Sequence, residues 1–193
     1  SVHEDSNHLR IAFGTADPDT WINITVAEGA EVGAIEDIAI GDIDGDGRVD
    51  LLIGADRANG VTGAEYAGWV TLHLSANLPA DGVVAVEGAH ARWLGQTDGE
   101  LLGHNMAAAG DIDGDGQADL LIAGYHSPAG GHNRGTVYGI SGASVSAGTR
   151  SIGSADWSVQ GSRDIEGLGH GMSTAGDVDG DGLMDLVMGG SCS

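Results

Sequence analysis

Three short acidic segments of this chain have the residues and the pattern expected of metal-binding loops. Each reads Asp-x-Asp-x-Asp-Gly-x-x-Asp, and together they hold twelve of the 29 acidic residues. The side chains at positions 1, 3, 5 and 9 can converge on one point, and position 7 can add its backbone carbonyl oxygen. The glycine at position 6 permits the sharp turn that wraps the chain around that point. The candidate ligands are Asp42, Asp44, Asp46, Arg48 and Asp50; Asp111, Asp113, Asp115, Gln117 and Asp119; and Asp177, Asp179, Asp181, Leu183 and Asp185.

Oxygen ligands in this number suit calcium, which takes about six to eight of them at ~2.3–2.6 Å. Magnesium needs a tighter octahedron than such flexible loops favour. We therefore expect three Ca²⁺ per chain, in loops 42–50, 111–119 and 177–185. Each ion would have a structural role, because it would tie two strands together.

The residues after the loops distinguish them from EF-hands. An EF-hand begins with the same aspartates but has a bidentate Glu at position 12 and a helix on each side. Position 12 is Ile53, Ile122 or Met188 in this chain, inside a short apolar run that starts directly after the loop. Such runs between glycines favour buried strands. The pattern therefore predicts a strand, a loop and a second strand.

The loops recur as part of a longer repeat. Their first aspartates lie 69 and 66 residues apart, and Leu102 to Asp111 matches Leu168 to Asp177. Further apolar segments follow each loop and also precede the first one. The expected strands comprise the segments on both sides of each loop and residues 9–13, 21–26, 68–74, 91–94, 135–140 and 156–159.

These segments predict an all-β fold, a β-propeller of four-stranded blades. In chain order they form groups of two, four, four and two strands, which is material for three blades with one blade split between the chain ends. Pairing strands from the two termini is a way to close a propeller and remove free sheet edges. The 35 glycines agree with many tight turns between short strands. We expect one domain over residues 1–193.

Charge and composition exclude several classes of partner. Seven basic residues against 29 acidic ones give a formal net charge of -22, which repels nucleic acid and anionic membrane surfaces. Apolar runs fall short of the ~18 residues of a membrane span, so no membrane insertion is expected. The single cysteine, Cys192, allows no internal disulfide. Bound cations would offset the self-repulsion of so many carboxylates.

With these loops and strands the chain resembles a known family, the FG-GAP repeats of the integrin α-subunit propeller, which also occur in bacterial secreted proteins. The calcium loops match closely. Leu102-Gly103 and Leu168-Gly169 stand at the family's "FG" position. The "GAP" position is held by Gly54-Ala55-Asp56, Ala123-Gly124-Tyr125 and Gly189-Gly190-Ser191, a partial match.

The resemblance implies a secreted or cell-surface protein and raises a question of ring closure. Integrin-like propellers have about seven blades, whereas a ring of three is below the usual ~4–8. One interpretation is a fragment of a longer protein. In the other, two chains form a homodimer that closes a six-bladed ring, with the half-blade at each terminus pairing with its counterpart from the partner chain.

The resemblance favours a non-enzymatic extracellular binding or adhesion module whose partner is another protein. It also permits a calcium-dependent lectin. A third interpretation is part of a larger polysaccharide lyase or phospholipase, although the seven scattered basic residues, all arginines, suit an anionic polysaccharide poorly. His104 and His170 hold equivalent places seven residues before a loop aspartate, which a repeated blade position explains without catalysis. No catalytic residues are expected.

Overall fold

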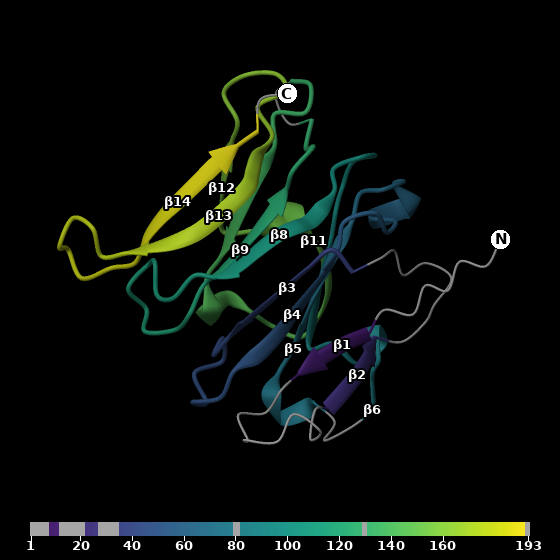
Figure 1. Ribbon diagram of the computed structural model, residues 1–193, viewed down its shortest axis with the longest axis vertical. Coiled ribbons are helices and arrows are strands. Elements are labelled where there is room, and N and C mark those ends of the chain that lie inside the picture. The colour runs from purple at the N-terminus through teal and green to yellow at the C-terminus, as the bar shows by residue number, and fades with distance from the viewer. Residues whose placement is uncertain (1–7, 12–21, 27–34, 79–81, 129–130, 192–193) are drawn as a thin grey trace.

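The computed structural model describes residues 8–11, 22–26, 35–78, 82–128 and 131–191 (Figure 1). Within these ranges the regular structure is β-strand, apart from short 3-10 helices of a single turn, and the predicted all-β class is confirmed. Among these residues no helix combines the length and the apolar character needed to cross a bilayer. The 3-10 helices are η2 (Val61–Gly63), η3 (Ser75–Asn77), η4 (Val86–Gly88), η5 (Gly142–Ser144) and η6 (Ile152–Ser154).

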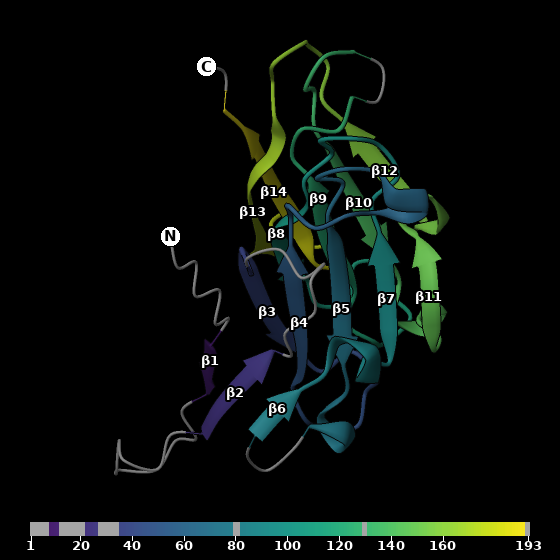
Figure 2. The ribbon, with the colours of Figure 1, turned by 90° about the vertical axis from the view of Figure 1, so that its right-hand side faces the viewer.

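Two larger sheets form the centre of the molecule. The first has the order β11-β7-β5-β4-β3, which Figure 2 shows from its broad side. Its members are β3 (Asp37–Gly41), β4 (Asp50–Ala55), β5 (Trp69–His73), β7 (Ala91–Leu94) and β11 (Gly148–Ser151). The second sheet has the order β12-β10-β9-β8. Its members are β8 (Leu102–Ala108), β9 (Leu120–Gly124), β10 (Thr136–Ile140) and β12 (Trp157–Gln160).

Two smaller sheets hold the strands nearest the chain ends. In one, β2 (Ile22–Val26) lies between β1 (His8–Ile11) and β6 (Gly82–Val84). The other consists of β13 (Leu168–Gly176) and β14 (Asp185–Gly190). The two sheets lie at opposite ends of the molecule in Figure 1, so one chain does not bring the terminal strand pairs together. Phe13 and Trp21, at the ends of two expected strands, lie outside the described residues.

Two strands, β6 and β11, were not expected from the sequence. Each lies in the connection between the third and fourth strands of its own unit but pairs in parallel with a strand of the preceding unit. β11 extends the first large sheet beyond β7, and β6 lies beside β2 in the same way. The shared pattern gives β2 the place of a fourth strand, as the order of apolar segments predicts. It also links successive units through backbone hydrogen bonds.

The inner strands are covered on both faces. Every residue of β4, β5, β9 and β10 is buried, which is the environment that continuous apolar runs favour. The main core lies between the two large sheets, where Leu52, Val70 and Trp93 belong to the same cluster as Met106 and Ile122. The apolar runs of β4 and β9 therefore attach the first two acidic loops to buried strands, whereas β13 and β14, which flank the third loop, are mostly half-buried or exposed.

Glycines let the two large sheets approach closely at one point. A Cβ on Gly54 of β4 would lie 2.4 Å from the carbonyl oxygen of Gly103 in β8. Gly103 itself has a φ of +87°, and a Cβ there would lie 2.9 Å from the carbonyl oxygen of Trp69. Because neither contact leaves room for a side chain, backbone meets backbone at this crossing.

Burial of one histidine makes the stability of this core depend on pH. His73 on β5 is 4% exposed, and its Nε2 lies 3.1 Å from the Thr71 hydroxyl oxygen. Burial lowers the pKa of His73 from 6.5 to about 4. The unfolded chain therefore binds a proton between these values that the folded chain does not bind. Above pH 6.5 the imidazole is neutral in both states and His73 leaves the free energy of unfolding unchanged. As the pH falls from 6.5 toward 4, the free energy of unfolding decreases, because only the unfolded chain gains the proton.

We predict that His73→Gln reduces the pH dependence of folding. Between pH 7 and pH 5 the free energy of unfolding of the native chain should fall by about 2 kcal/mol more than that of the variant. Urea unfolding of both proteins in saturating calcium measures this difference, because other titrating groups contribute equally to both. Equal pH dependence in the two proteins would show that His73 does not titrate in this way.

Candidate metal centres

Each acidic loop joins two antiparallel strands of one sheet. Loop 42–50 connects β3 to β4, loop 111–119 lies between β8 and β9, and loop 177–185 connects β13 to β14. The predicted strand, loop and strand arrangement is confirmed for all three. Since the paired strands leave the loop side by side, the first and last aspartates of each loop are brought close together.

Two glycines shape each loop. Gly45 and Gly47 have φ angles of +74° and +85°, and the glycines at positions 4 and 6 of the other two loops are also left-handed. A left-handed residue is costly for any side chain with a Cβ, so glycine at position 4 is needed as well as the predicted glycine at position 6. The two left-handed glycines reverse the direction of the chain, which turns the later aspartates of the loop back toward the first one.

The carboxylates themselves hold the loop backbone in this shape. In the first loop Asp42 Oδ2 accepts the N–H of Gly47 at 2.9 Å, and Asp50 Oδ2 accepts the N–H of Ile43 at 2.9 Å. The same two bonds recur in the second and third loops at 2.6 to 3.0 Å. Position 9 is thus a backbone clamp as well as a candidate ligand.

Three carboxylates converge in each loop. Their nearest oxygens lie within 4.8 Å of one another in the groups Asp42, Asp44 and Asp50; Asp111, Asp113 and Asp115; and Asp177, Asp179 and Asp185. The predicted aspartates Asp46, Asp119 and Asp181 lie outside these groups. Each accepts a backbone N–H instead, from Arg48, from Ile112 and Gly142, and from Leu183 respectively. The carbonyl ligands Arg48, Gln117 and Leu183 stay predictions.

The environment of these oxygens fits a bound cation. Asp42 Oδ1 is buried and has no hydrogen-bond partner among the described residues. The ion pairs within the same part of the chain leave all twelve loop carboxylates without a Lys or Arg partner. Carboxylates this close repel one another, and a buried oxygen without a partner carries a desolvation cost. A hard divalent ion would relieve both.

Hydrogen bonds and burial shift two pKa values in the second loop in opposite directions. The N–H of Gln117, followed by the hydroxyl of Ser141, holds the pKa of Asp115 below its ordinary value. Burial raises the pKa of Asp119, although the N–H groups of Gly142 and Ile112 oppose that shift. The ionised form is thus favoured at the exposed candidate ligand and disfavoured at the buried clamp.

Two serines near the loops were missed by sequence reasoning. Ser75 donates its N–H to Asp50 Oδ1 at 2.8 Å, and the hydroxyl of Ser141 donates to Asp115 Oδ2 at 2.8 Å. Ser141 directly follows the third strand of its unit and Ser75 lies two residues after it, so each of these loops is attached to three strands. The only signal in the sequence is a serine immediately after an apolar run, which is too common to identify a site.

Comparison with known proteins agrees with this architecture. The FG-GAP repeat model matches residues 35–72 and 105–140, which include the first two acidic loops. The chain is also 26% identical over 195 residues to integrin alpha pat-2 of Caenorhabditis briggsae and of Caenorhabditis elegans. Each alignment covers 94% of this chain, but the chain spans only about 15% of the length of these relatives.

We predict that the aspartate at position 9 of a loop stabilises the fold without metal, whereas the aspartate at position 3 acts mainly in calcium binding. Asp50 is fully buried and accepts two backbone N–H groups, so Asp50→Ala should lower stability by about 2–4 kcal/mol even without metal. Asp44 is exposed and accepts one N–H, so Asp44→Ala should change stability little without metal but weaken calcium binding. Urea unfolding over a range of calcium concentrations, extrapolated to zero, separates the effects. Equal losses at zero calcium would contradict the clamp role of Asp50.

Proposed function

We propose that this chain is a calcium-stabilised, integrin-like β-propeller module that acts as a non-enzymatic binding and adhesion protein outside the cell or at its surface. The main support is the convergence of three carboxylates in each of three acidic loops, with Asp42 Oδ1 buried and unpaired. FG-GAP repeats and the likeness to integrin α chains support the adhesion role.

Calcium is the ion that these loops suit best, because every candidate ligand is an oxygen and the loops are flexible enough for irregular coordination. The predicted carboxylates and the carbonyls of Arg48, Gln117 and Leu183 would hold it. Three ions would change the formal charge from -22 to about -16. The chemistry they supply is neutralisation of the loop carboxylates. Their effect would be to fix each strand pair in its blade.

A ring built from two chains is the form of assembly that we propose. Apolar side chains are exposed on β3 and β14, with Ile40 on β3 62% exposed and Val187 on β14 59% exposed. β14 has the sheet position of β4 and β9, yet among the described strands only β13 pairs with it. In a two-fold dimer the β1–β2 pair of one copy would supply the next two strands beside β14 of the other copy.

We expect calcium to raise thermal stability strongly and the mass in solution to be that of two chains. At a calcium concentration 100 times the dissociation constant, each site should add about 2.7 kcal/mol, and excess EDTA should remove it. Calcium titration followed by melting temperature and light scattering tests both points. Asp44→Asn, Asp113→Asn and Asp179→Asn combined should abolish the calcium effect.

Two outcomes would decide against parts of this proposal. An unchanged melting temperature in EDTA would exclude a structural role for calcium. A mass of one chain would exclude the closed dimer and favour a portion of a longer propeller, in line with the small share of its relatives that the chain spans.

The adhesion role is tested against the lectin and enzyme alternatives with the whole chain. We predict no EDTA-sensitive signal on a glycan array, and no turnover of polyuronate or phospholipid substrates in calcium. Calcium-dependent binding to a defined glycan would identify a lectin. Substrate turnover that persists after repurification would identify an enzyme.

A further inference from the structure

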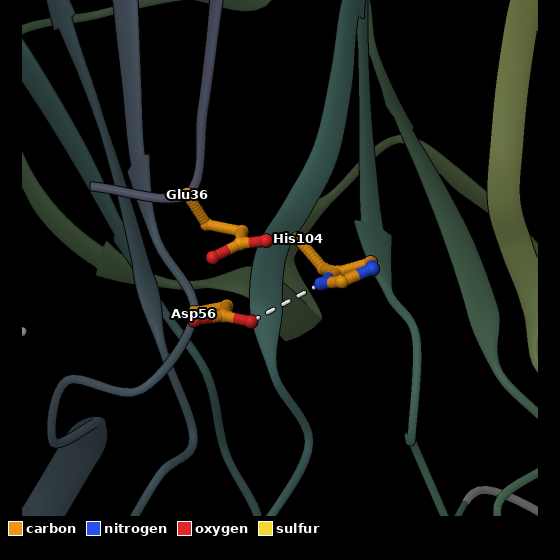
Figure 3. A group of neighbouring side chains, drawn as sticks. All are labelled: Glu36, Asp56 and His104. Atoms are coloured by element: carbon orange, nitrogen blue, oxygen red, sulfur yellow. Dashed lines mark hydrogen bonds and ion pairs between the residues drawn. The ribbon is translucent and has the colours of Figure 1, made fainter. Parts of the chain in front are cut away.

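A second kind of side-chain cluster lies away from the acidic loops, where the two large sheets meet. Glu36 immediately precedes β3, Asp56 immediately follows β4, and His104 lies in β8 of the other sheet. One ligand atom from each of the three lies within 4.8 Å of the others. Figure 3 shows the Glu36 and Asp56 carboxylates on one side of the group and the imidazole of His104 opposite them.

Backbone geometry brings these three residues together. The N–H of Glu36 donates to the carbonyl oxygen of Gly54 at 3.0 Å, which holds Glu36 close to the end of β4. In β8 the pairing with β9 is irregular between Leu102 and Asn105, so His104 falls within the irregular segment. The close approach of Gly54 and Gly103 lets this segment reach the neighbouring sheet.

The buried carboxylate at the centre of the group is incompletely paired. The side chain of Asp56 is 2% exposed, and its Oδ2 lies 3.1 Å from His104 Nδ1. Its Oδ1 has no hydrogen-bond partner among the described residues. The guanidinium Nε of Arg57, 3.9 Å from Oδ1, is too far for a hydrogen bond and belongs to a largely exposed side chain. Burying such an oxygen costs free energy unless a cation or donor reaches it.

The next sheet interface provides an internal comparison. Counted from the loop aspartates, the places of Glu36, Asp56 and His104 are taken there by Asn105, Tyr125 and His170. The Asn105 side-chain amide donates to the His170 carbonyl oxygen at 3.1 Å, and the Tyr125 and His170 rings lie 5.2 Å apart. The same crossing therefore packs without acidic side chains. Packing alone therefore does not explain the two carboxylates at the first interface.

The donor set points to an ion different from calcium. Calcium takes oxygen ligands, whereas one imidazole and two carboxylates suit a borderline transition ion such as Zn²⁺. Ligand atoms bound to one tetrahedral ion at about 2.0–2.1 Å lie about 3.3 Å apart, close to the separation of Asp56 Oδ2 and His104 Nδ1. Glu36 is exposed, so its side chain can rotate to complete the site. His104 also stacks on Tyr125 at 4.7 Å between ring centroids, which fixes the imidazole plane.

We propose that Glu36, Asp56 and His104 form a Zn²⁺ site that joins the two large sheets. Three protein ligands leave at least one coordination position open to water. The ion would neutralise Asp56 and connect β3 and β4 to β8, in addition to the hydrogen bond that the Met106 N–H of β8 donates to Asp37 Oδ2 of β3 at 2.7 Å. This site is independent of the acidic loops and of whether they bind calcium.

Metal titration of the calcium-saturated chain tests the proposal. Saturation keeps added metal out of the acidic loops. We expect one equivalent of Co²⁺ to produce the visible absorption of a site with nitrogen and oxygen ligands, and Zn²⁺ to displace it. Asp56→Asn and His104→Gln should each weaken binding by on the order of 100-fold or more. His170→Gln, the equivalent histidine of the next interface, is the matched control and should bind as the native chain does.

The alternative is that Asp56 and His104 form only an ion pair. In that case the native chain shows no saturable binding, or binding survives Asp56→Asn and His104→Gln, and the proposal is wrong. Equal weakening by His170→Gln would also overturn it, since the ligands would then lie elsewhere. If a variant fails to fold, imidazole nitrogen NMR of the native chain decides. Zn²⁺ must shift the His104 ring resonances at one equivalent, and an unshifted ring would exclude the site.

Discussion

The structure depends on holding mutually repelling carboxylates together where two antiparallel strands are joined. Within each loop the aspartates accept backbone N–H groups, and those same bonds bring three carboxylates within 4.8 Å of one another. The repulsion is opposed by the apolar strands on either side, whose burial holds the loop ends together. The loop chemistry and the core are therefore coupled, because weakening either one loosens the other.

The coupling reaches further than one strand pair. Ser75 and Ser141 attach the end of a third strand to the loops, and β6 and β11 connect each unit to the one before it through parallel pairing. Hydrogen bonds thus join the first two acidic loops to a third strand of their sheet, and parallel strand pairing joins successive units. Such an arrangement suits a module in which loops at the surface must keep a fixed mutual position.

The sheet interface around Gly54 and Gly103 shows how a repeated scaffold can carry a local specialisation. The same crossing occurs with Asp56 and His104 at one interface and with Tyr125 and His170 at the next. Because glycine backbone sets the approach of the sheets, the side chains around it are free to differ in chemistry. One interface places a tyrosine beside a histidine, the other places a carboxylate beside an imidazole, and the stacking of His104 on Tyr125 connects the two groups.

The sequence alone predicts the acidic loops, the strands on both sides of them and the all-β class, since aspartate spacing, glycine turns and apolar runs act over a few residues. It also placed β1 and β2 in the later half of a unit. Only the tertiary structure shows which three carboxylates of each loop converge, because the same oxygens also accept backbone N–H groups, some of them from distant residues such as Ser75 and Gly142. It alone revealed β6 and β11, whose short segments pair with a neighbouring unit, and the meeting of Asp56 with His104, 48 residues apart in the chain. Contacts between sheets depend on how closely backbones approach in space, and that distance is set by packing of the whole molecule.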